Sequence, residues 1–174
     1  MVPKTESPKA LKVVSEGIPD ELKVRPQWVC WRYALDSKSK WTKHPYNPRT
    51  GRMASHSDLM TWSPFEIVLD AYDDESAVGY DGVGFVFCSG DPYTGVDLDA
   101  CRDPETGEVE AWAAEIVQCL DSYTELSPSG TGLHIVVKGK VPAPLKRGGI
   151  EMYSVERYFT MSGHGGAGIL GVAA

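Results

Sequence analysis

The sequence predicts an α+β fold built around a mostly antiparallel sheet. Two helical segments are separated by runs of strong β-formers, in the order β, α, β, β, α and then several further strands. The strict alternation of strand and helix that indicates a doubly wound parallel sheet does not occur. With 174 residues, 42% of them hydrophobic and 24% charged, the chain has the length and composition of one ordinary globular domain.

The chain divides into an arm, a domain and a tail. Residues 1–17 are polar and are predicted to form an N-terminal arm, residues 18–164 the domain, and residues 165–174 a glycine-rich flexible tail. The first residues lack the apolar core of a signal peptide, and no run of about 18 apolar residues predicts a membrane segment. The four cysteines form no CxxC pair, which argues against a zinc ribbon or a disulfide framework and favours a reducing cytoplasm.

In the first half, aromatic and β-branched residues predict strands at 28–35 and 82–87 and a proline-stiffened extended segment at 41–48. A helix is predicted over 64–72, where Ser63 caps, Pro64 takes the first position and Glu66 completes a capping box. In the second half, a helix is predicted over 108–122, with an apolar stripe of Val109, Trp112, Ile116 and Leu120. The remaining predicted strands are 123–126, 133–138, 149–153 and 158–161.

An acidic strand is predicted to end at Asp99 and to form a hairpin with the strand 82–87 through the turn 89–92. Because successive strand side chains point to opposite faces, Asp97 and Asp99 share one face, about 6 to 7 Å apart. Their repulsion is relieved by a cation, a proton or water, and hard oxygen ligands select Mg²⁺ or Mn²⁺. A solvated strand face uses the same residues, so the pair alone leaves both interpretations open.

A glycine-bearing turn follows in residues 127–132 and delivers His134 onto an apolar strand. The turn contains Ser129 and Gly130, and its backbone amides and hydroxyls, with the imidazole, are suitable donors to phosphate oxygens. An ordinary core or surface histidine is the alternative.

Glu151 is a third carboxylate, placed in an otherwise apolar strand where an unpaired charge is costly. A metal would remove that cost, and so would a salt bridge to Arg147 or Arg157. Arg157 also leads into a small, hydroxyl-rich turn typical of a triphosphate or sugar pocket, unless this is an ordinary strand end.

The net charge of −7 argues against tight, purely electrostatic binding of nucleic acid. Basic residues nevertheless gather at 38–52 and 138–147, and acidic ones at 70–75 and 97–115. A basic groove beside an acidic metal site and a solvated mixed surface both fit this pattern.

Taken in order, three motifs resemble those of archaeo-eukaryotic-type primases: the acidic strand 96–99, the turn and strand 129–134, and Ile150 with Glu151. The chain is most similar to the primase-polymerase domain of phage and plasmid replication proteins. Segments 43–47 and 157–163 also resemble blocks of the phage branch. The resemblance covers roughly residues 26 to 164.

This resemblance implies an RNA-recognition-like catalytic sheet beside a smaller N-terminal α/β module, with the active site between them. It implies a template-directed nucleotidyltransferase, a DNA primase or polymerase, in which a primer 3′-hydroxyl or a first nucleotide attacks the α-phosphate of a bound nucleotide. The implied ligands of two divalent ions, Mg²⁺ or Mn²⁺, are Asp97, Asp99 and Glu151. The implied nucleotide contacts are Ser129, Gly130, His134, Arg157 and Lys43.

The implied partners are a single-stranded DNA template, a primer strand and dNTP or NTP, with a helicase domain or protein as a further candidate. The implied location is the cytoplasm of a bacterial host, with the protein encoded by a phage or mobile element. Trp28, Trp41 and Tyr46 are either stacking surfaces for bases or core residues.

Other functions remain open at this point. A metal-dependent nuclease uses similar acids without a triphosphate pocket, and a non-catalytic nucleotide or single-stranded DNA binding module would use the acids structurally. A rolling-circle nickase needs two histidines one residue apart, but Val136 stands two positions after His134. A helix-loop-helix calcium site is disfavoured because Cys101 and Arg102 occupy positions that need an oxygen ligand and a glycine.

Overall fold

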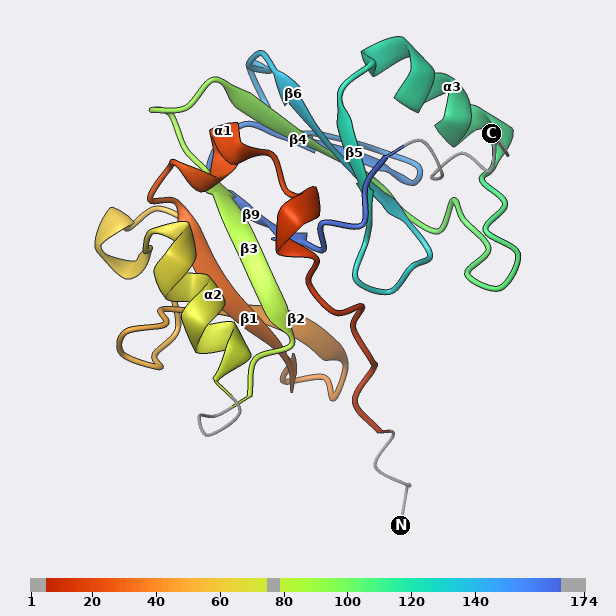
Figure 1. Ribbon diagram of the computed structural model, residues 1–174. Coiled ribbons are helices and arrows are strands. Elements are labelled where there is room, and N and C mark those ends of the chain that lie inside the picture. The colour runs from red at the N-terminus through yellow and green to blue at the C-terminus, as the bar shows by residue number, and fades with distance from the viewer. Residues whose placement is uncertain (1–5, 75–78, 167–174) are drawn as a thin grey trace.

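A computed structural model describes residues 6–74 and 79–166. It confirms the α+β prediction but divides the strands between two antiparallel sheets (Figure 1). The first sheet has the order β2-β1-β3-β9, with β1 Trp28–Leu35, β2 Trp41–Tyr46, β3 Gly82–Phe87 and β9 Arg157–Met161. The second has the order β5-β6-β4-β8-β7, with β4 Tyr93–Leu98, β5 Tyr123–Leu126, β6 Leu133–Lys138, β7 Leu145–Arg147 and β8 Ile150–Tyr153.

Helices cover both sheets. The elements are α1 Asp20–Lys23, α2 Phe65–Asp73 and α3 Ala111–Leu120, with short 3₁₀ turns η1 Ser15–Gly17 and η2 Leu59–Thr61. One face of the first sheet is covered by α2, and the face of the second sheet that points away from the first is covered by α3 (Figure 1). Within the described part of the chain, no helix is long and apolar enough to cross a membrane.

Most strand bounds agree with the prediction, including β1, β3, β5 and β6. The extended segment predicted to reach residue 48 is regular only to Tyr46, and β4 ends at Leu98, one residue before Asp99. The short exposed strand β7 was not predicted, because its three residues carry no apolar alternation.

Strands β3 and β4 do not form the predicted hairpin. Both edges of each strand are taken by other partners, β3 by β1 and β9 and β4 by β6 and β8. Buried Asp91 holds the connection between them, accepting hydrogen bonds from the backbone N–H groups of Cys88 (2.8 Å) and Tyr93 (2.7 Å). Gln27 and Lys140 donate to the same carboxylate, at 2.8 and 3.0 Å. The anchored turn therefore carries the chain from one sheet into the other.

The predicted capping box before α2 is wrong. The helix begins at Phe65 without a side-chain cap, and Ser63 instead exchanges two backbone hydrogen bonds with Trp28. This pairing holds Ser63 in extended geometry beside β1. The buried side of α2 is confirmed, since Phe65 and Val68 are buried in the core, with Leu69 and Tyr72 packed against it.

The second long helix is shorter than predicted. It begins at Ala111 rather than Glu108, because Glu110 donates its backbone N–H to Cys101 and Val109 forms a bridge with Arg102. Trp112 was predicted on the apolar stripe but is 37% exposed. Buried Ala113 lies in the helix–sheet contact instead.

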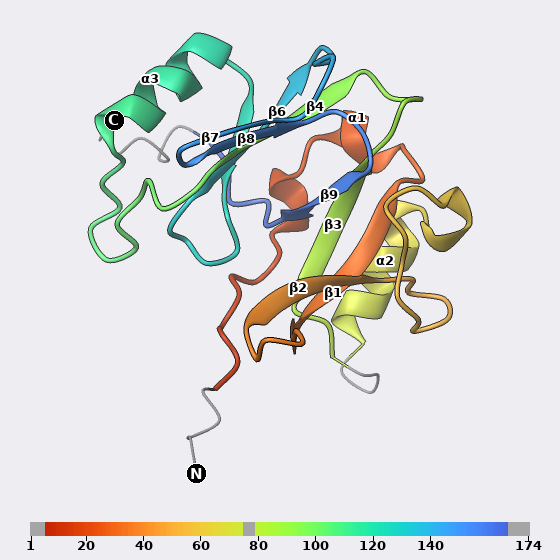
Figure 2. The ribbon, with the colours of Figure 1, turned by 180° about the vertical axis from the view of Figure 1, so that it is seen from behind.

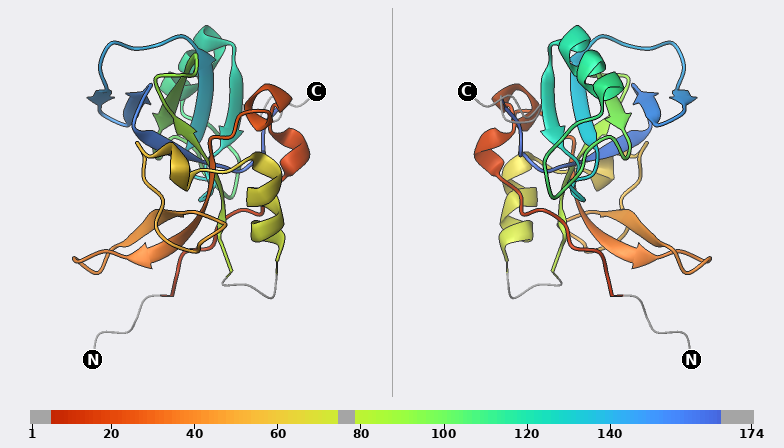
Figure 3. Two further views of the ribbon diagram at one scale, coloured as in Figure 1. Left: turned by 90° about the vertical axis from the view of Figure 1, so that its left-hand side faces the viewer. Right: turned by 90° about the vertical axis from the view of Figure 1, so that its right-hand side faces the viewer.

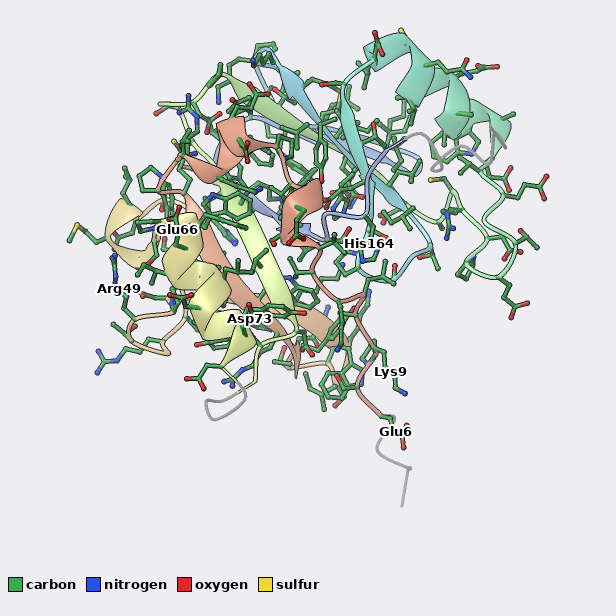
Figure 4. The ribbon with its side chains drawn as sticks, in the orientation of Figure 1. Glu6, Lys9, Arg49, Glu66, Asp73 and His164 are labelled. Atoms are coloured by element: carbon green, nitrogen blue, oxygen red, sulfur yellow. The ribbon has the colours of Figure 1, made fainter. Side chains whose placement is uncertain are left out.

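The segment that precedes α1 contacts the turn between β5 and β6 of the second sheet and the residues that follow β9 of the first sheet. Leu11 donates its N–H to the carbonyl of Pro128 (2.8 Å), and Val14 donates to Ser162 (2.9 Å). His164 donates from Nε2 to the carbonyl of Lys12 at 2.7 Å, and Figure 4 shows this histidine beside the segment. The part of the predicted arm from Leu11 to Val14 thus contacts the domain, while residues 1–5 of the arm and 167–174 of the predicted tail lie outside the described part.

The two sheets pack closely together at Gly95 on β4. A Cβ atom there would lie 2.6 Å from ring atoms of both Phe159 and Phe87, which belong to the first sheet. This glycine lets β4 lie directly on the aromatic core, two residues before Asp97.

We expect Gly95→Ala to lower the free energy of unfolding by about 2 kcal/mol, because overpacking forces rings or backbone to shift. Urea unfolding followed by circular dichroism measures the change. The matched control is Gly90→Ala, since a Cβ at Gly90 meets only Cys88 Sγ, at 3.7 Å. Equal stability of the two variants would contradict this account of the sheet contact.

Candidate active site

A row of charged and polar side chains crosses the second sheet. The register places Glu125 opposite His134, His134 opposite Asp97, Asp97 opposite Glu151, and Glu151 opposite Lys146. Directly paired residues share a face, so these five side chains, the charged row, follow one line across the five strands. The opposite face is apolar and packs beneath α3 through Val96, Leu98, Leu133 and Ile135.

Asp97 occupies the middle of the charged row. Its Oδ1 lies 3.6 Å from Nε2 of His134, and its side chain is 25% exposed. Burial raises the pKa of Asp97, and the charges of Asp99 and Glu151 raise it further, while His134 and Lys43 oppose the shift. The negative charges of Asp97, Asp99 and Glu151 therefore interact with one another, and His134 and Lys43 compensate them only in part.

His134 is held in one orientation. Its Nδ1 donates a hydrogen bond to the carbonyl of Thr160 at 2.8 Å, because a carbonyl oxygen only accepts. The ring centroid lies 5.0 Å from that of Phe159, and the residue is 5% exposed. The hydrogen bond to Thr160 leaves Nε2 facing Asp97.

Glu125 is one of the two members of the row that were not predicted from the sequence, and Lys146 is the other. It is fully buried, and its two oxygens accept hydrogen bonds from the backbone N–H groups of Ser162 (2.8 Å) and Gly163 (2.7 Å). The Tyr123 hydroxyl donates a third at 2.6 Å, and burial together with Glu125 raises the pKa of Tyr123. Oε1 of Glu125 also lies 3.8 Å from Nδ1 of His134. No local sequence signal identifies Glu125, because its place in the row depends on its register with His134.

Glu151 has an ion-pair partner, and it is neither of the predicted arginines. Lys146 forms the ion pair from β7, and Tyr153 donates its hydroxyl to the other oxygen of Glu151 at 2.5 Å. Arg157 reaches this group indirectly, through a 2.9 Å hydrogen bond to the Tyr153 hydroxyl. The hydrogen bonds from Lys146 and Tyr153 lower the pKa of Glu151.

The central part of the row opens onto a cleft of about 450 Å³ that the first sheet closes on its other side. The β1–β2 hairpin of that sheet projects away from the second sheet (Figure 3). The residues that line the cleft include Asp97, His134 and Glu151 on one side and Lys43, His56, Arg157 and Tyr158 on the other. The cleft therefore has an acidic wall and a wall with basic groups.

Lys43 is the basic residue most affected by this arrangement. Burial lowers its pKa, and the charges of Asp97 and Asp99 oppose that shift. Tyr158 fixes the local backbone by donating its hydroxyl to the Lys43 carbonyl at 2.5 Å. The sequence analysis did not identify His56, whose ring stacks on Tyr158 with centroids 5.6 Å apart.

Three predicted site residues lie beside the cleft rather than in its lining. Asp99 is exposed just beyond β4 and donates its N–H to the carbonyl of Gly149. In the turn before β6, the Ser129 hydroxyl bonds the hydroxyls of its neighbours Ser127 and Thr131, at 3.1 and 2.8 Å. Gly130 has a φ of 74°, which only glycine adopts easily, and its carbonyl accepts from Arg102.

The structure thus brings five of the eight predicted residues into one cleft: Lys43, Asp97, His134, Glu151 and Arg157. Asp99, Ser129 and Gly130 lie at the end of the second sheet where β4 ends and β6 begins. The turn that contains Ser129 and Gly130 returns to the sheet at Gly132, next to the carbonyl of Leu98.

The donor atoms fit a hard divalent cation. Asp97 and Glu151 are direct cross-strand neighbours, and burial, together with the charges of Asp99 and Glu151, raises the pKa of Asp97, so a cation there would stabilise the charged carboxylate. Over the ranges 6–74 and 79–166, however, no three His, Cys, Asp or Glu side chains are close enough to form a ready ligand set. Lys146 holds one of the carboxylates instead.

Comparison with known proteins gives a phage relative. The DNA primase-polymerase of Nitratiruptor phage NrS-1 is 37% identical over 144 residues, which are 79% of this chain and 19% of the phage protein. The chain therefore spans about a fifth of that relative's length. No protein-family model matches the chain. The similarity confirms the resemblance that the three motifs predicted.

Proposed function

The chain belongs with the phage DNA primase-polymerases, and on that premise we propose that it catalyses template-directed nucleotidyl transfer. The observation that carries the proposal is the charged row, which faces Lys43 across the cleft. An acidic wall suits divalent ions and a basic wall suits phosphate, so the two walls suit a metal–nucleotide complex.

In this proposal Asp97, Asp99 and Glu151 hold Mg²⁺ or Mn²⁺, with two ions expected. Such ions stabilise the attacking and leaving oxygens of an in-line displacement at phosphorus. The three carboxylates supply hard oxygen ligands, and the largely buried position of Asp97 limits the screening of its own charge by bulk water.

Residues of both walls and of the turn before β6 bind the nucleotide. Lys43 and Arg157 contact phosphate oxygens as cations, and His134 presents Nε2 while Thr160 fixes its other nitrogen. Ser129 and Gly130 add hydroxyl and backbone donors from the neighbouring turn. A primer 3′-hydroxyl, or a first nucleotide when synthesis begins, then attacks the α-phosphate and expels pyrophosphate.

The proposed partners are a single-stranded DNA template, a primer strand and dNTP or NTP, with a helicase as a further candidate. We assign the second sheet with α3 to the RNA-recognition-like catalytic module and the first sheet with α2 to the smaller N-terminal module. Strand β9 joins the two, since it follows β8 of the second sheet and pairs with β3 of the first. We place the reaction in the cytoplasm of a bacterial host.

Nucleotide binding tests this function against its alternatives. Calorimetry with dATP and MnCl₂ is expected to show saturable, Mn²⁺-dependent binding by the parent chain, weakened at least about tenfold in Asp97→Ala. The control Glu115→Ala removes an exposed carboxylate from α3 and is expected to bind as the parent does.

Other outcomes identify other functions. Cleavage of DNA without dATP binding would indicate a metal-dependent nuclease, and site-specific nicking of one strand would indicate a nickase. Binding of dATP that Asp97→Ala leaves unchanged would indicate a non-catalytic binding module.

A further inference from the structure

We infer that Lys146 changes partners in the catalytic cycle, pairing with Glu151 in the metal-free site and contacting the nucleotide triphosphate when a divalent ion binds Glu151. The inference rests on the proposed function and adds a substrate contact that the sequence analysis did not identify. It assigns a role to the outermost member of the charged row.

The geometry makes Lys146 the movable member of the pair. It lies on β7 directly opposite Glu151, in the β7–β8 hairpin at the edge of the second sheet (Figure 2). The Lys146 side chain is 72% exposed, whereas that of Glu151 is 14% exposed. Glu151 is also fixed by the Tyr153 hydroxyl, and all three residues of β7 are exposed. A long exposed lysine therefore moves more easily than its carboxylate partner.

The same pairing blocks a ligand position. The ammonium of Lys146 contacts Oε1 of Glu151, and Tyr153 occupies Oε2, so both oxygens already have donors. A divalent ion and Lys146 cannot both take the same lone pairs of Oε1. Lys146 therefore competes with the ion for Glu151 and must be released when the ion binds.

The released ammonium has one suitable new partner in the proposed complex. Asp97, Asp99 and Glu151 are then neutralised by metal, and the remaining uncompensated negative charge near the hairpin is that of the triphosphate. Arg157 donates a hydrogen bond to the Tyr153 hydroxyl, which itself donates to Glu151, so Lys146 and Arg157 both lie within two contacts of one carboxylate beside the cleft. Paired cations of this kind are suited to a phosphate chain.

The test compares Lys146→Gln with Arg147→Gln. Arg147 is the next residue of the same exposed strand, but its cross-strand partner is Ile150 rather than Glu151, so it controls for loss of one positive charge nearby. Mn²⁺ binding, measured from the spin-resonance signal of free Mn²⁺, is expected to tighten about fivefold in Lys146→Gln and to change less than about twofold in Arg147→Gln.

The second readout has the opposite sign. With saturating Mn²⁺ and no DNA, dATP is expected to bind Lys146→Gln about fivefold more weakly than the parent, and Lys146→Arg is expected to restore the affinity. Equal effects in the glutamine variants of residues 146 and 147, or unchanged dATP affinity in Lys146→Gln, would overturn the inference.

The outcomes also separate this inference from the proposed function. If Asp97→Ala abolishes Mn²⁺ binding while Lys146→Gln behaves as Arg147→Gln, the metal site stands and the role of Lys146 is wrong. If Asp97→Ala binds Mn²⁺ as the parent does, the proposed metal site itself is wrong, and the inference fails with it.

Discussion

Asp97→Asn is expected to reduce nucleotide incorporation by about 10³-fold or more while leaving the metal-free fold at least as stable as the parent. Asparagine keeps the shape of the side chain but removes the charge from the centre of the row. Loss of one central ligand should therefore affect metal and nucleotide together.

The stability half of this prediction follows from the sign of the pKa shift. Burial raises the pKa of Asp97 in the folded chain, and Asp99 and Glu151 add to the shift. A carboxyl whose pKa is raised by folding contributes its stability below that pKa and loses it as pH rises through it. Near neutral pH the ionised Asp97 therefore costs stability, and asparagine removes that cost.

Two measurements check the prediction, namely extension of a primed template with Mn²⁺ and urea unfolding in EDTA. Glu115→Gln, on the exposed side of α3, is expected to match the parent in both. An Asp97→Asn protein that is markedly less stable than the parent, or that retains most of its incorporation, would contradict the role given to this residue.

Glu125→Gln is expected to have the largest effect on stability, a loss of about 3 kcal/mol in the free energy of unfolding. The amide brings donor hydrogens toward backbone N–H groups of Ser162 or Gly163 that now point at a carboxylate. One of these buried donors is then left without an acceptor.

Tyr123→Phe is the matched comparison, because it removes one donor and keeps the carboxylate, at a cost of about 1 kcal/mol. Glu125→Gln is also expected to disturb His134, whose Nδ1 bonds Thr160 two residues before Ser162. Nitrogen chemical shifts of the His134 ring report this change. Equal stability of the two variants, with an unchanged His134 ring, would contradict the structural role given to Glu125.

Local sequence signals predicted the strands and the acids well. Dense β-formers gave the bounds of β1, β3, β5 and β6. Glu151 was identified because a charge in an apolar strand needs a partner. These inferences succeeded because each depends on neighbours a few residues away.

Long-range pairing could not be predicted in the same way. Turn residues around Asp91 predict a reversal of the chain but not whether the two strands pair, and here each strand takes other partners. The pairing of β9 with β3 brings Thr160 to His134, across 26 residues of sequence. Glu125 and Lys146 could be identified only from the strand register, which places them at the two ends of the charged row.

The most direct test of the central claim is template-directed incorporation by the parent chain. Homopolymer DNA templates, with and without a primer, are offered each dNTP separately in Mg²⁺ and in Mn²⁺. The account predicts metal-dependent products only with the complementary nucleotide, and products without a primer would add priming activity. A folded chain that binds neither nucleotide nor DNA and makes no product would contradict the assignment of the charged row as a nucleotidyl-transfer site.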